Sequence, residues 1–566
     1  MFFRTIVNFY HDVTREKIKS TIMASAVAIL GLLVVYPIGI LFWKSFLDQA
    51  GNFTLANYVA VFTEPGLSVA LKNSLIVASW TTLACAAVGM PMAFAVARTN
   101  MPLKTLVTGA VLISFVIPSF IQAIAWILLL GPRAGLINVF LRNTLHLPLN
   151  LNIFGMPGLV FVLTLNFYPL IFYGLVAALN NMDPSYEEAA RMVGAKSWQS
   201  AIGISFPLVS PALFTGIVLV FLDGVAAFGA PITIGLPAKI PVITTRIYQL
   251  FSYPPRYELA AACATPIVVL TALGLISQRL YLGRKQFITV TGKASHPEPI
   301  DVGKWKYVLL AFCLMVVFVA VVLPLMVLVR TSLTKVWGLA LTAKNFTLAN
   351  YQMLFDPTFY VMRSIENSFV LGVAAATFCV ILCVVICWMV ERAKVKGGEI
   401  LTFLSMVTFA FPAMALGVGI LLGFMVKPFN LQGTLTIMLI GYMSKRVSYA
   451  FVLIRNTMKQ IDPEFEEAGR LVGASWFRSI KDIAIPLLKS GLMVAWILVF
   501  AVCLRELSMA ILLYLPGNET MAVSIFNLLD DGALEGSATV SVVVSVMSIA
   551  AVFGVRKIVG KSVMEI

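Results

Sequence analysis

Long, unbroken runs of apolar residues recur along the whole chain and are separated by shorter polar segments. A run of about 20 such residues is long enough to cross the roughly 30 Å hydrocarbon core of a bilayer as a helix. The runs are continuous rather than alternating, which favours helices over the strands of a membrane barrel. The pattern predicts twelve membrane-spanning helices. Their approximate positions are 21–43, 73–97, 105–130, 158–180, 208–235, 259–278, 307–329, 367–390, 400–426, 433–454, 490–515 and 537–555.

The composition supports an integral membrane protein. Hydrophobic residues make up 60% of the 566 residues, charged residues only 12%, and the mean hydropathy is +0.93. A soluble domain carries roughly 25% charged residues. The net charge of +15 does not indicate nucleic acid, because the basic residues follow the topology: 26 Lys and Arg fall in the inner segments if the amino terminus is inside, against 12 in the outer segments. This bias predicts that both termini are cytoplasmic.

The chain also contains a direct repeat. The sequence NFTLANY at 52–58 recurs at 345–351, and Asn-Ser at 73–74 recurs at 367–368. Later landmarks recur at an offset of 279, as Pro207 does at Pro486. Six spans in each half make the two repeats parallel, related by a pseudo-twofold axis along the membrane normal. The predicted segments are a cytoplasmic segment at 1–20, a six-span domain at 21–278, a cytoplasmic linker at 279–306 and a second six-span domain at 307–566.

The longest inner loop of each half carries one spaced motif: Glu-Ala-small, three residues, Gly, nine residues, Ile, one residue, an apolar residue and Pro. The small residues leave a smooth helix surface for a partner, and the glycine allows the left-handed turn that ends the helix. Large aromatic residues follow, and these suit insertion into a pocket of another protein. An ordinary helical hairpin is the alternative, but it does not explain the same spacing in two equivalent loops. The motif residues and aromatics are Glu188, Ala189, Ala190, Gly194, Trp198 and Pro207 in the first half, and Glu467, Ala468, Gly469, Gly473, Trp476, Phe477 and Pro486 in the second.

These loops resemble the cytoplasmic coupling loop of bacterial ABC-importer permeases, and the resemblance covers the whole chain. It implies two tandem six-helix domains of the type I importer fold in the bacterial inner membrane. It further implies a periplasmic binding protein that delivers the solute and two copies of a cytoplasmic ATPase that receive the loops. The departures are small: Gly469 replaces the third-position Ala, and Phe206 and Ile485 replace the usual Leu before Pro.

The fusion of two domains and the sequence RELSMAILLYLPG at 505–517 look most like the ferric-iron and 2-aminoethylphosphonate group of these permeases. This resemblance implies ferric iron or a phosphonate-like anion as the solute. The choice between the two stays open in the sequence, since specificity resides largely in the separate binding protein.

Neither a catalytic nor a cofactor site is expected in this chain. A phosphate-binding loop needs Gly five residues before Gly292-Lys293, and Phe287 stands there instead. ATP is therefore expected to be bound and hydrolysed by a partner subunit. The seven cysteines all fall within predicted spans, and Cys379, Cys383 and Cys387 share one helix face. We expect them to act as small packing residues rather than as metal ligands.

Charged residues inside the predicted spans mark a candidate translocation pathway. Lys445 and Arg446 fall near the middle of the tenth span, Arg505 and Glu506 interrupt the eleventh, and Asp223 lies in the fifth. A charge at the bilayer centre costs about 2.5–3.5 kcal/mol, so it normally faces protein or a water-filled cavity. A pathway for a small anion is one interpretation. The other is structural: an internal pair between Arg505 and a carboxylate, with Asp223 as a candidate, and a Lys445 side chain that snorkels to the inner interface. The first-half equivalents are uncharged: Asn166, Phe167, Ala226 and Ala227.

Two short amphipathic stretches precede the last span of each half, at 241–253 and 521–531. They are expected to contact the binding protein, or else to lie on the membrane surface.

Two other functions fit six plus six parallel spans. The first is a secondary active transporter of the major facilitator type. The loops between the second and third spans of each half, RTNMPLK and ERAKVKGGE, lack the basic Gly-Asp-Arg-type motif usual there, and such a transporter does not need duplicated coupling loops. The second alternative is a membrane scaffold or insertase without transport.

Overall fold

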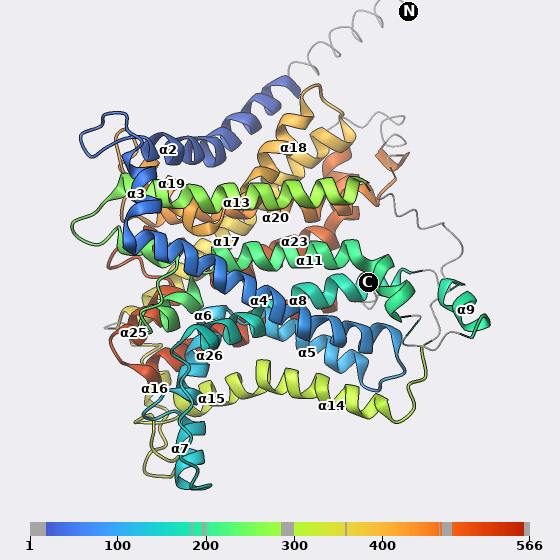
Figure 1. The fold of residues 1–566 in the computed structure, drawn as a ribbon. Coiled ribbons are helices and arrows are strands. Elements are labelled where there is room, and N and C mark those ends of the chain that lie inside the picture. Colours follow the sequence, from blue (N-terminus) through green and yellow to red (C-terminus); the bar gives the residue numbers. More distant parts are fainter. Residues whose placement is uncertain are drawn as a thin grey trace, which may run out of the picture. The chain divides into compact units, whose positions relative to one another are not determined.

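The computed structural model describes residues 19–182, 185–194, 199, 201–284, 299–356, 359–462, 464–466 and 478–559. In this part of the chain ten helices are long and apolar enough to cross a membrane (Figure 1). Two further pairs of shorter helices meet at sharp bends, and counting each pair as one span gives up to 12. The all-helical membrane fold predicted from hydropathy is confirmed.

The helices group into two units. Unit 1 comprises Met1–Phe46, Arg363–Ala522 and Ala550–Lys561, and unit 2 comprises Leu47–Met362, Val523–Ile549 and Ser562–Ile566. The 3-10 and π-helical turns carry the label η. The elements of unit 1 are η1 (Gly31–Val35), α2 (Tyr36–Ser45), α17 (Tyr360–Cys387), η5 (Trp388–Arg392), α18 (Gly398–Val407), η6 (Thr408–Ala410), α19 (Ala413–Phe424), α20 (Leu435–Lys459), η7 (Ser479–Ala484), α23 (Ile485–Leu504) and α24 (Ala510–Leu513).

Unit 2 is the larger of the two. Helices α25 (Met521–Asp530) and α26 (Leu534–Val559) belong mostly to it. Its other elements are α3 (Ala56–Thr63), α4 (Pro65–Arg98), α5 (Lys104–Val116), α6 (Ser119–Leu130), α7 (Leu136–Asn143), α8 (Met156–Asn180), α9 (Ser185–Met192), η2 (Ala201–Ser205), α11 (Phe206–Ala226), η3 (Pro231–Gly235), α12 (Ile243–Gln249), α13 (Tyr257–Arg284), α14 (Trp305–Val317), η4 (Phe318–Val322), α15 (Leu323–Ser332) and α16 (Ala349–Gln352).

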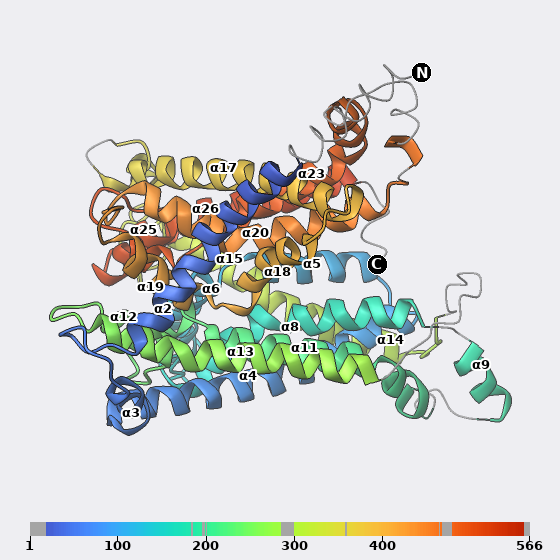
Figure 2. The same cartoon turned by 90° about the horizontal axis from the view of Figure 1, so that it is seen from above.

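Each unit contains the first span of the opposite half of the sequence. In unit 1, α2 packs on α19 (Figure 2). The Tyr36 hydroxyl donates a hydrogen bond to the Gly423 carbonyl at 2.8 Å. Gly419 allows this close approach, since a Cβ there would overlap the Pro37 carbonyl. In unit 2, α14 and α15 pack on α4, α5 and α6, and Gln122 Nε2 donates to the Ala320 carbonyl at 2.9 Å. The repeated halves are thus interleaved in space.

The repeated sequence NFTLANY forms the same turn twice in unit 2. Thr54 and Thr347 each accept a hydrogen bond at 3.0 Å from the backbone N–H two residues later, which starts a short helix. The second asparagine of each copy joins this helix to the chain just after the preceding span. Asn57 donates a hydrogen bond to the Leu47 carbonyl and Asn350 donates one to the Thr334 carbonyl. The identity of the two copies therefore reflects one local hydrogen-bond pattern that follows each first span.

Four predicted spans differ from the structure in a way that matters for function. The spans predicted at 105–130 and 400–426 are not straight, since their two helices meet at 97° and 111° respectively. The spans predicted at 208–235 and 490–515 are too long, because α11 ends at Ala226 and α23 ends at Leu504, and the chain continues through the separate elements η3 and α24. Hydropathy did not detect these breaks because the residues around them are as apolar as the helices they separate.

Candidate coupling loops and transport pathway

The first coupling loop joins α8 to α11 in unit 2. Glu188, Ala189 and Ala190 belong to α9, and Gly194 follows with φ of +84°, in the left-handed region that favours glycine. Pro207 stands in the first turn of α11, where its missing N–H is not needed. Trp198 lies outside the described residues.

The second coupling loop joins α20 to α23 in unit 1. Asp462 Oδ1 accepts the backbone N–H of Glu464 at 3.0 Å, and the helical residues 464–466 follow. Pro486 stands in the first turn of α23, as Pro207 does in α11. The motif residues between these points lie outside the described residues. They are Glu467, Ala468, Gly469, Gly473, Trp476 and Phe477.

The two bent spans break at equivalent prolines, Pro118 and Pro412. The residue before each proline has an extended backbone, as proline favours, so the carbonyls of the last helical turn lose the regular donors that a continuing α-helix would supply. Such a group needs another partner, because lipid offers none.

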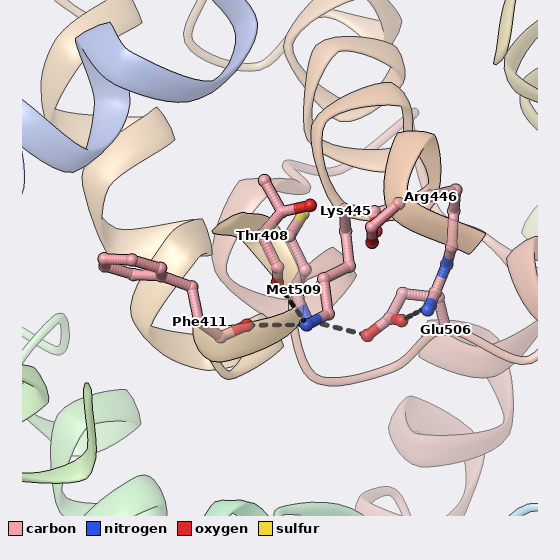
Figure 3. Close-up of polar contacts among 7 residues, drawn as sticks. Thr408, Phe411, Lys445, Arg446, Glu506 and Met509 are labelled. Atoms are coloured by element: carbon pink, nitrogen blue, oxygen red, sulfur yellow. Dashed lines mark hydrogen bonds and ion pairs between the residues drawn. The ribbon is translucent and has the colours of Figure 1, made fainter. Parts of the chain in front are cut away.

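The tenth span and its first-half equivalent supply these partners. In unit 2, Asn166 Nδ2 on α8 donates to the Ile117 carbonyl at 2.7 Å. In unit 1, Lys445 Nζ on α20 donates to the Phe411 carbonyl at 2.6 Å and to the Thr408 carbonyl at 3.0 Å (Figure 3). Asn166 and Lys445 occupy the same position of the repeat. An amide in one half and an ammonium group in the other therefore donate to the equivalent carbonyl, that of the residue before the proline.

Arg446 and Glu506 form a buried ion pair in unit 1, with side chains 6% and 9% exposed (Figure 3). The other oxygen of the carboxylate accepts the backbone N–H of Met509 at 3.3 Å, beyond the point where α23 ends. The guanidinium also lies over the Tyr449 ring, 5.6 Å from its centroid. The pair thus ties α20 to the turn between α23 and α24.

The remaining candidate pathway residues lie in different units. Arg505 is half-buried at the C-cap of α23 in unit 1, whereas Asp223 is exposed on α11 in unit 2. Their pairing stays a prediction. At positions 445, 446, 505 and 506, three cations accompany one carboxylate around the break after α23, where the first half is uncharged. This region can therefore stabilise negative charge, and three of its charged groups, Lys445, Arg446 and Glu506, also make the structural contacts described above.

The Asn-Ser repeat, noted in the sequence only as a landmark, holds the two amphipathic stretches. Asn73 Nδ2 donates to the Pro241 carbonyl, and Ser74 Oγ accepts the N–H of Ile243 at the start of α12. In unit 1, Ser368 Oγ accepts the N–H of Met521 at 2.8 Å in the same way, where α25 begins. The ring of Tyr248 on α12 lies edge-on to Phe526 on α25, with centroids 6.4 Å apart.

The profile of the family "binding-protein-dependent transport system inner membrane component" matches residues 87–286 and 387–564, and each match contains one coupling loop. The ferric transport system permease protein FbpB of Actinobacillus pleuropneumoniae is 26% identical over 517 residues, which cover 90% of this chain and 74% of FbpB.

Other relatives match one half of the chain. The putative 2-aminoethylphosphonate transport system permease protein PhnV of Salmonella typhimurium (strain LT2) is 28% identical over 225 residues, 39% of this chain and 82% of PhnV. Among solved structures, a chain of a bacterial ABC transporter involved in the import of the acidic polysaccharide alginate aligns with 49% of this chain and 99% of its own length. It is 19% identical, with a TM-score of 0.42.

The role of Lys445 at the helix break predicts an asymmetric response to substitution. Lys445→Asn introduces the residue of the first half and should keep a donor for the Phe411 carbonyl. Lys445→Leu leaves buried carbonyls without this donor and should destabilise the protein by about 1–3 kcal/mol. Thermal unfolding of the purified protein in detergent measures the difference. The control is Lys344→Leu, which removes an exposed cation from an outer loop. A Lys445→Leu variant as stable as the wild type would show that the break needs no such donor.

Proposed function

Because this chain belongs to the family of inner-membrane components of binding-protein-dependent transport systems, we propose that it forms the membrane pathway of an ATP-driven importer. The observation that carries this proposal is the duplicated coupling motif, which lies inside both regions matched by the family profile. A secondary transporter has no use for two such loops. No feature of the described residues favours that alternative.

We place the chain in the bacterial inner membrane with both termini in the cytoplasm. The two permease domains are the repeats at 21–278 and 307–566, joined by the cytoplasmic linker 279–306, with the cytoplasmic segment 1–20 before them. The excess of basic residues in the inner segments supports this orientation.

Two copies of a cytoplasmic ATPase dock on the coupling loops and supply the free energy for transport. The chain lacks the glycine-rich loop that binds ATP phosphates, so the nucleotide belongs to that partner and not to a cofactor site of this chain. The left-handed Gly194 ends α9 sharply and leaves the loop as a separate short helix. Such a helix suits a pocket on the surface of a partner.

A periplasmic binding protein delivers the solute at the opposite side of the membrane. The stretches α12 and α25 are the contact sites that we propose for it. Both are fixed at their starts by hydrogen bonds to the Asn-Ser repeats, and their aromatic rings meet at Tyr248 and Phe526. A pair of helices held in place in this way is well suited to receive a folded partner, because little conformational freedom is lost on binding.

The solute is ferric iron or a phosphonate-like anion, carried as a small anion or anionic complex. FbpB is named as a ferric and PhnV as a 2-aminoethylphosphonate permease protein, and both resemble this chain. Three cations and one carboxylate surround the break after α23. Lys445, Arg446, Arg505 and Glu506 are the residues that we assign to the pathway of this solute.

Substitution of the coupling glycines tests the proposed link to the ATPase. Gly194→Val places a β-branched residue at a position with φ of +84°, which strains the backbone by about 1–3 kcal/mol. Gly473→Val makes the same change at the equivalent position of the second motif. We expect ATP hydrolysis to continue while solute uptake falls, in protein of normal abundance. Gly203→Val is the matched control, since Gly203 lies in the same loop region with open space around it. Unchanged uptake with both glycines replaced would contradict the coupling role.

Uptake of radiolabelled ferric iron and of radiolabelled 2-aminoethylphosphonate tests the solute. We expect ATP-dependent uptake of one of them, and Arg505→Ala should lower it about tenfold, because one half-buried positive charge of the pathway is lost. Binding of the ATPase should stay normal, and Lys344→Ala should have no effect. If Arg505→Ala, Lys445→Ala and Arg446→Ala all keep normal uptake, the anionic pathway is wrong. If they fail to assemble, the charges are structural.

A further inference from the structure

Arg392 lies where three segments of unit 1 meet on the way to the second coupling loop. It is the last residue of η5, the turn that continues α17. Its Nη2 atom donates to the carbonyls of Met458 at 2.9 Å and Ile461 at 2.6 Å, at the end of α20. Its Nε atom lies 3.1 Å from Glu466 Oε1, directly before the coupling motif begins at Glu467.

The side chain is well matched to this position. The last carbonyls of a helix have no intrahelical donors, and a cation near them also complements the helix dipole. A guanidinium presents several N–H groups in one rigid plane, so it can serve two carbonyls and a carboxylate at once, which a lysine ammonium does not do with the same geometry. The side chains of Arg392 and Glu466 are only 7% and 5% exposed, so water screens their attraction little.

The same residue types stand at the equivalent positions of the first half. Arg98 ends α4 as Arg392 ends η5, at the offset of 294 that relates Pro118 to Pro412. It is 1% exposed. Glu187 stands directly before Glu188, as Glu466 stands before Glu467. The Glu187 side chain lies outside the described residues, so the first-half pair rests on sequence position and on the burial of Arg98.

A neighbouring ion pair provides a contrast. Glu391 accepts a hydrogen bond from Arg455 Nε at 2.5 Å and lies 3.9 Å from Lys459 Nζ. This pair also joins η5 to α20, but it does not include the coupling segment and is more exposed. Its first-half equivalents are Ala97, Val176 and Asn180, so it is not part of the repeat. The residue types of the Arg–Glu pair therefore recur at the equivalent sequence positions, and those of the neighbouring pair do not.

We propose that Arg392 and Glu466 are positioning residues that transmit movement of the second coupling loop to α17 and α20, and that Arg98 and Glu187 do the same in the first half. The proposal rests on the proposed function, since it names the residues through which the ATPase acts on the spans. Because one guanidinium holds the loop and two helix ends, the loop cannot shift alone without breaking a buried ion pair.

The physical consequence is a rigid connection at one point. A loop joined to its spans only by backbone turns would absorb part of the ATPase movement in those turns. With the pair intact, a displacement of residues 464–466 moves the ends of α17 and α20 together. Loss of the pair should therefore leave ATP hydrolysis in place and reduce its effect on the spans.

The test uses the complete importer in nanodiscs and proteoliposomes, with Glu466→Gln and Arg392→Lys as variants. Glu466→Gln removes the negative charge with little change in shape. Arg392→Lys keeps the positive charge but loses the planar set of N–H donors. Both should bind the ATPase at wild-type stoichiometry. Uptake per ATP hydrolysed, with radiolabelled ferric iron and 2-aminoethylphosphonate as probes, should fall about fivefold or more, within the usual range of coupling between sites. The double variant should be no worse than the single ones, because the two residues act as one unit.

Glu391→Gln is the matched control and should keep wild-type uptake per ATP. Equal losses in Glu391→Gln and Glu466→Gln, or wild-type coupling in Glu466→Gln, would overturn the proposal. So would parallel losses of assembly, hydrolysis and uptake, which indicate a purely structural pair.

Amide hydrogen exchange of residues 455–466, with and without ADP-vanadate, tests the proposal without any solute. The nucleotide-dependent change in exchange rate should become smaller in Glu466→Gln but not in Glu391→Gln. An unaltered change in Glu466→Gln would count against the pair. A wild-type complex that binds no ATPase would instead refute the proposed function itself.

Discussion

Every backbone polar group that leaves a helix inside the membrane needs a partner from the protein, because lipid supplies none. This constraint shapes the two bent spans. Their breaks at Pro118 and Pro412 free carbonyls at membrane depth, and Asn166 and Lys445 on the neighbouring spans provide the donors. Non-helical backbone of this kind is tolerated only where it is buried in protein or lines a water-filled cavity. Each break is thus stabilised by a side chain from a neighbouring span, so the bent span depends on that neighbour.

The interleaving of the repeats adds a second dependence. The first span of each half packs in the unit formed mainly by the other half, so neither half of the sequence contains all the helices of one unit. Such contacts are of high sequence separation, and they join the two repeats more firmly than the linker 279–306 alone could. Movement imposed on one coupling loop therefore acts on a unit that contains helices from both halves. This arrangement suits a transporter whose two halves must move in concert.

Hydropathy and the sequence repeat were sufficient to predict the helical membrane fold and the approximate positions of the spans, because both depend on local composition. They did not predict the helix breaks, since apolar residues continue through them, nor the role of Lys445, which depends on a carbonyl of a different span. Snorkelling to the interface was the wrong alternative for this residue, whose ammonium group binds carbonyls within the bundle. The role proposed for Arg392 was not predicted, because a basic residue at the inner end of a span is common. Two repeats in the sequence could have indicated its role: an arginine ends the second span of each half, at Arg98 and Arg392, and a glutamate stands directly before each coupling motif.

The central claim is that one chain carries two equivalent docking sites for an ATPase. Native mass spectrometry of the complex, purified from cells that also produce the cognate ATPase, tests this claim most directly. We expect one copy of this chain with two ATPase subunits. The same measurement on a variant with the loop at residues 185–194 replaced by a flexible linker should show a single ATPase subunit. A complex with no ATPase, or one that keeps two subunits after this replacement, would contradict the claim.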